Sequence, residues 1–345
     1  MKGVLLVNLG SPDSTNPKDV KKYLDEFLMD PLVIDIPKPL RAFVVRGIIL
    51  NTRPKKSAEA YKKIWWEEGS PLIVLSERFK NKIQDKVNLP IALAMRYGSM
   101  SIENGMQELV EQGVNHVLVV PLYPQFAMST VETINDKVAE IKEKRFPELE
   151  ISTLPVFYDD LQYIQVLSQS IKEGLKGKQY DHVLFSYHGV PTSHIKKRDV
   201  TQKDCRIDKT CCYTPSAAHE FCYRHQCLAT SELVAKELGW KEGSYSNSFQ
   251  SRLGIDPWLE PFTDATIERL AKKGIKDLAV VTPAFVSDCL ETLEEIAMEG
   301  EEIFLQSGGK GFIAIPCLND REDWINLMVS WIEKWRILDL ETAIA

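Results

Sequence analysis

The sequence predicts an α/β protein built from two similar Rossmann-like lobes, each a parallel sheet flanked by helices. Two observations predict this class. Apolar runs of strand length alternate with longer amphipathic segments along the chain, which is the pattern of repeated β-α-β units. The order of these segments in the first half also recurs in the second half. We therefore expect two equivalent sheets, with ligands bound beyond the carboxyl ends of their strands.

The first half of the chain contains three predicted strands, each followed by a polar turn and a helix. The strands are expected over residues 3–8, 91–95 and 116–122, and the helices over residues 17–28, from residue 101, and over residues 130–144. Ser101 marks a helix start because its side chain can cap the first turn, where the charge of Glu103 complements the helix dipole.

The second half repeats this scheme, with strands expected over residues 183–187, 244–249 and 278–282. A boundary near residue 159 gives an N-terminal lobe, 1–159, and a C-terminal lobe, 160–319. A last helix within residues 320–338 carries Trp331 and Trp335 one turn apart, so we expect it to pack back on the first lobe.

An apolar stretch, residues 40–50, precedes a polar and basic stretch, residues 51–70. One interpretation is a core helix followed by a loop, and the sequence alone favours it. The alternative is a hydrophobic lip over a pocket or against a membrane.

Composition argues against several classes of protein. The 345 residues are 44% hydrophobic and carry a net charge of -7, with a pI near 5.6, so a basic face for nucleic acid is not expected. The N-terminal segment lacks the length and cleavage site of a signal peptide, and no apolar run is long enough to span a bilayer. We expect a cytoplasmic protein, and peripheral contact with a membrane stays open.

Two nucleotide-binding motifs are absent. The chain has no G-x-G-x-x-G after the first predicted strand and no G-x-x-x-x-G-K-[ST]. Dehydrogenase and nucleoside-triphosphatase functions therefore lose most of their support.

A histidine follows one of the predicted strands. His188 comes directly after an apolar run, Gly189 permits a tight turn or a close backbone approach, and Pro191 stops the strand. A neutral imidazole at the carboxyl end of a strand suits metal binding or proton transfer. The structural alternative is a histidine whose hydrogen bonds are satisfied at the edge of the sheet.

Carboxylates follow another predicted strand. Asp288, Glu291 and Glu295 are spaced i, i+3 and i+7, so a helix that begins near Asp288 would carry all three on one face. Ser287 or Asp288 could also cap this helix. The structural alternative is a solvated acidic face that the helix dipole favours.

Seven short segments resemble those of one family, in the family's order. They are residues 6–12, 95–98, 121–125, 186–191, 249–252, 257–259 and 287–295. The chain resembles the ferrochelatases, which insert ferrous iron into protoporphyrin IX in the last step of haem synthesis. The resemblance implies a lyase that forms protohaem with release of two protons. It also implies the class II chelatase-like fold, with an active-site cleft between the two lobes.

The resemblance also implies roles for individual residues. His188 is implied as a metal ligand or acceptor of the pyrrole protons and Glu291 as its catalytic partner, with Asp288 and Glu295 continuing a path for protons or metal. The implied porphyrin contacts are Leu9, Arg53, Arg96, Tyr97, Tyr123 and Trp258. Among these, Arg53 would hold a propionate and Trp258 would form an aromatic wall. Animal-type members have a second histidine where this chain has Cys289, which leaves His188 with more of the chemistry.

Five of the seven cysteines fall within residues 205–227. They lack the C-x-x-C pairs of zinc ribbons, but four thiolates suit either a [2Fe–2S] cluster or structural zinc. Because some bacterial ferrochelatases carry cluster cysteines in an internal segment, the expected ligands are Cys205, Cys212, Cys222 and Cys227, with Cys211 as an alternative. Reduced, partly buried thiols in a helical insert are the structural alternative.

Three further functions stay open at this point. The substrate could be coproporphyrin III, the protein could be a chelatase for another metal and tetrapyrrole, or it could be a non-catalytic redox sensor that binds tetrapyrrole or metal. The expected partners are protoporphyrin IX and Fe²⁺, without nucleic acid, and the chain is expected to be a monomer or a homodimer.

Overall fold

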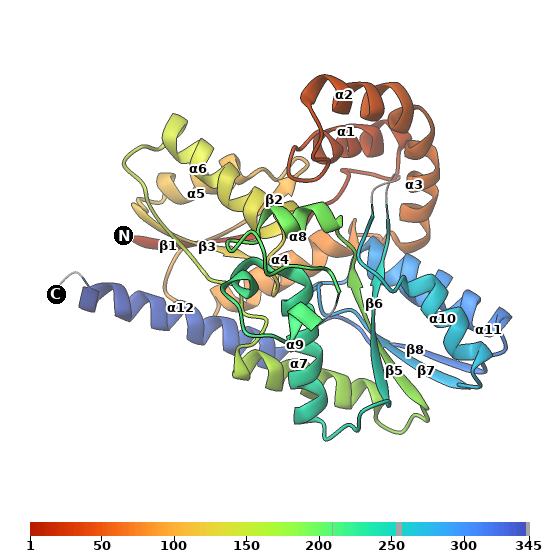
Figure 1. Cartoon of the computed structure of the whole chain (residues 1–345). Coiled ribbons are helices and arrows are strands. Elements are labelled where there is room, and N and C mark those ends of the chain that lie inside the picture. Colours follow the sequence, from red (N-terminus) through yellow and green to blue (C-terminus); the bar gives the residue numbers. More distant parts are fainter. Residues whose placement is uncertain (209, 253–256, 343–345) are drawn as a thin grey trace. The chain divides into compact units, whose positions relative to one another are not determined.

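The computed structural model describes residues 1–208, 210–252 and 257–342 (Figure 1). The chain divides into two compact units. Unit 1 contains Met1–Leu122, Met128–Pro155 and the segment from Asn319 onward, and unit 2 contains Tyr123–Ala127 and Val156–Leu318. Among the helices of the described ranges, none combines the length and apolar character that a membrane span requires.

The sheet of unit 1 has four parallel strands in the order β2-β1-β3-β4. Their bounds are Lys2–Gly10 for β1, Ile91–Tyr97 for β2, His116–Pro121 for β3 and Glu150–Thr153 for β4. The central strand β1 is fully buried from Val4 to Val7, as expected for a parallel strand covered on both faces.

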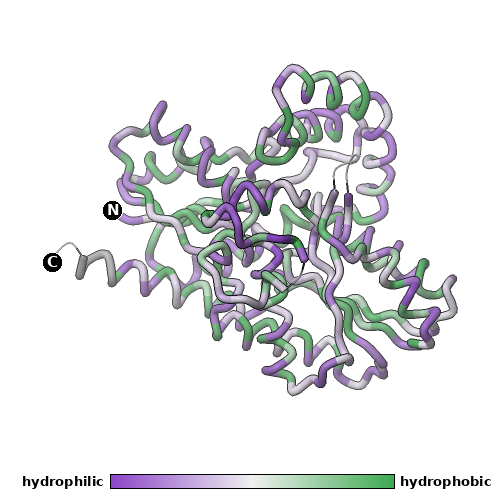
Figure 2. Tube along the Cα trace, viewed as in Figure 1, coloured by the Kyte–Doolittle hydropathy of each residue, from purple (hydrophilic) through white to green (hydrophobic). Residues whose placement is uncertain are grey.

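The sheet of unit 2 repeats this order as β6-β5-β7-β8, again with parallel pairing. The bounds are His182–His188 for β5, Tyr245–Gln250 for β6, Asp277–Val281 for β7 and Gly311–Ala314 for β8. Hydrophobic residues concentrate along the strands of both sheets (Figure 2). The predicted α/β class with two equivalent parallel sheets is confirmed.

The helices of unit 1 begin where the sequence provides caps. Asn16 accepts a hydrogen bond from Lys18 N at the start of α1 (Pro17–Leu28), and Ser101 accepts one from Asn104 N at the start of α5 (Ile102–Glu111). The other helices of this unit that flank the sheet are α4 (Pro71–Gln84), the π-helix η2 (Met128–Glu132), α6 (Thr133–Arg145) and α12 (Glu322–Thr342).

The last helix, α12, belongs to unit 1. Its Trp324 is fully buried, and the indole ring stacks on Phe79 of α4 with 5.5 Å between ring centroids. Lys86, just after α4, also bonds to Glu322 and Asn326 of α12. Aromatic packing and these polar contacts therefore hold α12 against α4.

The stretch after α1 differs from the favoured prediction. Residues 38–64 form continuous helical turns, α2 (Lys38–Ala42), the π-helix η1 (Phe43–Ile49) and α3 (Leu50–Ile64), so the predicted loop after residue 50 is wrong through residue 64. The apolar part is not a core helix, because Leu40, Phe43 and Ile48 are 51%, 66% and 54% exposed.

The helices of unit 2 surround its sheet. Their bounds are Leu161–Leu175 for α7, Thr192–Lys197 for α8, Thr210–Cys212 for η3, Ala217–Phe221 for η4, Tyr223–Glu237 for α9, Thr263–Lys272 for α10, Glu291–Gly300 for the π-helix η5 and Glu301–Gln306 for α11. On one face, Ile267 and Leu270 of α10 pack with Ile296 of η5 and with Val280 of β7. This core anchors η5, which carries Glu291.

Candidate active site

His188 is the last residue of β5. Its Nδ1 lies 2.7 Å from the main-chain oxygen of Gly189. A carbonyl oxygen can only accept a hydrogen bond, so Nδ1 carries the proton and Nε2 of the neutral ring keeps its lone pair. The half-buried imidazole can therefore accept a proton or bind a metal ion through Nε2.

Gly189 lets the chain pass close to strand β6. Its N–H donates to the carbonyl oxygen of Gln250 at 2.7 Å. A Cβ at this position would lie 2.9 Å from the main-chain oxygen of Ser251 and 3.2 Å from the Trp258 ring. Only glycine fits here without displacing backbone.

Two aromatic rings flank His188. The centroids of Trp258 and Phe285 lie 6.5 Å and 6.3 Å from the imidazole centroid. Trp258 forms an isolated β-bridge with Pro191, and the next residue donates from its N–H to the carbonyl oxygen of Val190 at 3.1 Å. Main-chain bonds thus hold the half-buried indole beside residues 188–191, called the histidine turn below.

The helix that follows β7 is not the predicted one. It is the π-helix η5, which begins at Glu291 after one helical residue, Leu290, so Asp288 lies before the helix and neither Ser287 nor Asp288 caps it. The helical turns start at Leu290, two residues after the predicted start near Asp288. The single α-helical face is wrong, because a π-helix bonds i to i+5 and has a different side-chain periodicity.

The three carboxylates have separate surroundings. Asp288 is buried, and its Oδ1 accepts hydrogen bonds from Thr292 Oγ1 at 2.9 Å and Cys317 N at 3.3 Å. Glu295 accepts one from Ser251 Oγ at 2.6 Å. Glu291 is half-buried at the start of η5.

Cys289 is buried directly beside these carboxylates. Burial raises the pKa of its thiol well above the usual range, and the nearby Glu291 carboxylate raises it further. Cys289 is therefore a neutral thiol at neutral pH, hydrogen-bonded to Glu291. It can donate a hydrogen bond but is a poor metal ligand in this state.

In unit 1, the polar groups of Arg96 and Tyr97 both bind Asp30. The carboxylate Oδ2 of Asp30 accepts hydrogen bonds from Arg96, from the Tyr97 hydroxyl at 2.9 Å and from Thr133 Oγ1 at 2.6 Å. Arg96 Nε also donates to Thr133. Burial raises the pKa of Tyr97 far above its ordinary value, so its hydroxyl remains protonated.

The remaining predicted porphyrin contacts lie on different elements. Leu9 is half-buried near the carboxyl end of β1, and Arg53 is exposed on α3, both in unit 1. Tyr123 is 8% exposed in the short segment that belongs to unit 2.

The thiols of the cysteine segment form a chain of contacts around Cys222. A hydrogen bond with Cys222 raises the pKa of Cys205. For Cys222, the bond from Cys205 lowers the pKa, but the bond to Cys212 and burial together raise it to about 11. Cys227 is fully buried, and burial raises its pKa as well.

The cysteine segment includes the start of a helix. Helix α9 begins at Tyr223, so Cys222 is its N-cap residue and Cys227 lies inside the helix. The Sγ of Cys222 accepts a hydrogen bond from His225 N at 3.5 Å. Within residues 1–208, 210–252 and 257–342, no three His, Cys, Asp or Glu side chains form a group that could hold a metal ion.

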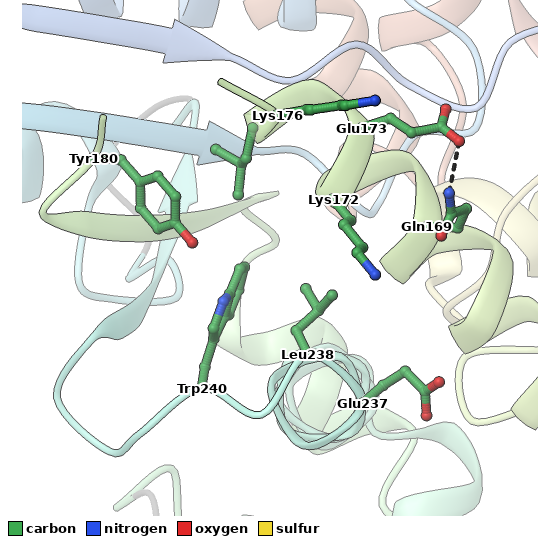
Figure 3. A pocket seen from close by; sticks show the side chains of 9 residues that line it. Gln169, Lys172, Glu173, Lys176, Tyr180, Glu237, Leu238 and Trp240 are labelled. Carbon is green, nitrogen blue, oxygen red and sulfur yellow. Dashed lines mark hydrogen bonds between the residues drawn. The ribbon is translucent and has the colours of Figure 1, made fainter. Parts of the chain in front are cut away.

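A hollow of about 640 Å³ lies in unit 2 beside the start of β5 (Figure 3). Tyr180, Trp240 and Leu238 face it together with Lys172, from α7, the turn before β5 and the end of α9. None of the predicted site residues lines it, and His188 lies at the opposite, carboxyl end of β5. A second hollow of about 350 Å³ in unit 1 includes Tyr97 and the turn after β1, Ser11 to Asp13.

Sequence reasoning missed two residues that contact the predicted site. Asp30 binds the polar ends of Arg96 and Tyr97, and Gln250 donates from its side chain to the main-chain oxygen of Glu291. Asp30 has no sequence signal apart from its place after an amphipathic helix. Gln250 lies within a segment that resembles the family, but nothing in the sequence shows which way its amide points.

Comparison of the sequence with known proteins identifies the family of this chain. The family model described as ferrochelatase matches residues 1–335. The chain belongs to the ferrochelatase family. It is 48% identical over 322 residues to the ferrochelatase of Pseudomonas syringae pv. tomato, covering 93% of this chain and 94% of the relative. It is 46% identical over 337 residues to the ferrochelatase of Opitutus terrae, covering 97% of each chain.

Two solved structures share the fold of this chain. The chain is similar to SirB from Bacillus subtilis with Fe³⁺, with a TM-score of 0.55 and 13% identity over 96% of this chain and 94% of that one. A second SirB structure, a sirohydrochlorin chelatase in complex with cobalt, gives a TM-score of 0.51 at 14% identity over 95% of this chain and 92% of that one. The expected family, its lyase class and the class II chelatase-like pair of lobes are confirmed.

Proposed function

We propose that the protein inserts Fe²⁺ into protoporphyrin IX, with release of the two pyrrole protons. The observation that supports this most directly is the end of β5, where the Nδ1 bond of His188 leaves the Nε2 lone pair for a proton or a metal ion. Glu291, in the same unit, begins a helix whose first turn is bonded to the neighbouring strand β6. Family membership supports the same reaction.

The proposed reaction uses a histidine base together with carboxylates. Metal insertion replaces two N–H protons by a divalent cation, so it needs proton acceptors close to the ring. We assign His188 Nε2 as the acceptor of a pyrrole proton and Glu291 as the second group that takes a proton or binds the arriving ion. Asp288 and Glu295 would continue this path away from the ring.

The proposed porphyrin contacts are described for each unit by itself: Leu9, Arg53, Arg96 and Tyr97 in unit 1, and Tyr123 and Trp258 in unit 2. Arg53 is exposed on α3 and carries a charge suited to a propionate. Trp258 offers an aromatic face beside His188. Leu9 and Tyr123 would add apolar surface. Arg96 and Tyr97 contribute rigid walls in this proposal, because Asp30 occupies their polar groups.

The iron is a substrate that passes through the site. Nitrogen and oxygen donors with few fixed partners bind such an ion weakly enough to release it, whereas a closed cage would retain it. His188 and Glu291 are the proposed transient ligands. Their few donors suit transfer of the ion to the four porphyrin nitrogens.

For the cysteine segment, we propose that Cys205, Cys212, Cys222 and Cys227 hold a [2Fe–2S] cluster, with Cys211 as the alternative ligand. The support is that the thiols of Cys205 and Cys212 each interact with that of Cys222. The described side chains do not form a metal-binding group, so binding of a cluster would require the segment to rearrange. A bound cluster would cross-link the segment, and it would require the thiols to lose their protons. Iron, sulfide and the visible spectrum of freshly purified protein test it: a colourless, iron-free sample would exclude the cluster.

The place of the protein in the cell is also a proposal. We infer a cytoplasmic monomer or homodimer that touches membranes through the exposed apolar side chains Leu40, Phe43 and Ile48. Flotation with lipid vesicles tests this: the wild type should float, and a variant with Ser at all three positions should not.

Anaerobic insertion assays test the proposed reaction. The purified protein receives Fe²⁺ and either protoporphyrin IX or coproporphyrin III, and the loss of free porphyrin absorbance gives kcat and KM. We expect turnover with protoporphyrin IX and a loss of at least about 100-fold in kcat for Glu291→Gln. Turnover with coproporphyrin III alone would reassign the substrate, and no turnover with either would reject the enzyme in favour of a binding protein.

A further inference from the structure

A chain of buried hydroxyl and amide groups lies beneath the proposed site in unit 2. This hydrogen-bond network runs through Ser248, Thr263, Ser186 and Gln250 and ends at the main-chain oxygen of Glu291. The four side chains belong to residues that are no more than 4% exposed. They come from β5, β6 and the first residue of α10, so the hydrogen-bond network joins three elements to the start of η5.

The donor and the acceptor of every hydrogen bond in this network follow from its last acceptor, the main-chain oxygen of Glu291. The carbonyl oxygen of Glu291 can only accept, so the side-chain nitrogen of Gln250 donates to it at 3.1 Å. The amide oxygen of Gln250 therefore faces Ser186, whose hydroxyl donates to it at 2.9 Å. The amide orientation is fixed by its partners on both sides.

The hydroxyl groups follow in order. Ser186 has one proton, which it gives to Gln250, so Thr263 must donate to Ser186 across their 2.8 Å contact. The proton of Thr263 is then committed, and Ser248 must donate to Thr263 at 2.9 Å. Aligned buried bonds polarise one another, so removal of one donor weakens the others.

Gln250 is also the main-chain partner of the histidine turn. It lies opposite His188 in the parallel pairing of β5 with β6, and its carbonyl oxygen accepts from Gly189 N at 2.7 Å. Gln250 thus bonds through its backbone to Gly189, the residue after His188, and through its side chain to the main chain of Glu291.

We infer that Gln250 is a positioning residue for metal insertion: it fixes the distance between the His188 imidazole and the Glu291 carboxylate. This inference rests on the proposed function, because it gives Glu291 its place in the reaction. Gln250 itself does not touch the reacting atoms. Its hydrogen bond to the main chain of Glu291 fixes the backbone position from which the Glu291 side chain extends. Small displacements of a catalytic group lower the rate by large factors.

The test replaces the donating side-chain nitrogen of Gln250 without changing the size or shape of the side chain. Gln250→Glu keeps the length and the acceptor for Ser186 but turns an oxygen toward the carbonyl of Glu291. We expect kcat for iron insertion to fall at least tenfold, while KM and the dissociation constant for metal-free porphyrin change by less than about threefold. Gln250→Met, which keeps the length without a donor, should behave in the same way if Gln250→Glu does not fold.

Gln84 provides a matched control. This glutamine in unit 1 also donates from its amide to main-chain oxygens, those of Val87 and Leu89, and accepts from Ile91 N. Gln84→Glu should lower the melting temperature as Gln250→Glu does, but leave kcat within about threefold of the wild type. An equal loss of kcat in both variants would show a general stability effect and would overturn the inference.

A double-mutant cycle separates the inference from the proposed function. If Gln250 acts through Glu291, then adding Gln250→Glu to Glu291→Gln should lower kcat by less than about twofold further. Independent, multiplying losses would overturn the positioning role while leaving Glu291 catalytic. Full activity of Glu291→Gln alone would overturn the proposed site and the inference with it.

Discussion

Arg96 donates to the carboxylate of Asp30 inside unit 1, and both side chains are almost closed to solvent, at 12% and 3% exposed. Thr133 bonds to both partners, and the Tyr97 hydroxyl donates to the same carboxylate oxygen. An ion pair enclosed in this way fixes the strand end that carries Arg96. It also explains why Arg96 is better suited to shape a wall than to bind a substrate anion.

Asp30→Asn should lower the free energy of unfolding by about 3–5 kcal/mol, because it leaves the charge of Arg96 buried without its counter-ion. Denaturant unfolding measures this. Asp25→Asn is the control, since the pair between Asp25 and Arg46 is exposed and screened by solvent. Equal losses in the two variants would contradict the structural role of the Asp30 pair.

Gly189→Ala should destabilise the protein by about 1–3 kcal/mol, because the added methyl group would meet the backbone of β6. Iron insertion should fall as well, since the histidine turn must move away from Gln250. Gly47→Ala is the control: the nearest atoms there belong to the Phe43 ring at 3.6 Å, an ordinary contact. A Gly189→Ala protein with wild-type melting temperature and rate would argue against a close-packed turn.

Trp324→Ala should cost about 3–5 kcal/mol, because it opens a cavity against Phe79 where the indole is fully buried. Chemical denaturation checks this value. Ile337→Ala, on the exposed part of α12, should change stability by no more than about 0.5 kcal/mol. A small effect of Trp324→Ala would mean that α12 does not need α4 for its stability.

His182 should make the protein less stable in mild acid. Burial lowers the pKa of His182 in the folded protein, while in the unfolded chain it is close to about 6.5. Below that pH the unfolded chain binds the proton first, so stability falls as the pH decreases and the loss is complete below the folded pKa. Melting temperatures from pH 7.5 to 5 should fall less for His182→Gln than for the wild type. Parallel curves would show that His182 does not contribute.

The sequence predicts the longer strands, including the edge strands β2 and β6, but not the short edge strands β4 and β8. Apolar runs identify β1, β3, β5 and β7, because parallel strands buried on both faces are apolar throughout. The strands β4 and β8, at one edge of each sheet, have no predicted counterpart, because they have four residues each and are not fully buried, so the apolar signal is short and interrupted.

Within the site, motif and position identify residues but not the bonds between them. His188 could be placed at a strand end from its preceding apolar run. The π-helix at Glu291 could not be predicted, because its i, i+3 and i+7 carboxylates look like an α-helical face and nothing local distinguishes the two helix types. Gln250 and Asp30 act through contacts distant in sequence, 41 and 66 residues away from Glu291 and Arg96, which no local pattern reveals.

The rate of iron insertion by His188→Ala tests the central claim most directly. The assay uses Fe²⁺ and protoporphyrin IX without oxygen, with His182→Gln at the other end of the same strand as the matched control. We expect kcat to fall at least about 100-fold in His188→Ala, with partial recovery when imidazole is added, and to stay within about threefold in His182→Gln. A His188→Ala protein that folds normally and inserts iron at the wild-type rate would contradict the account.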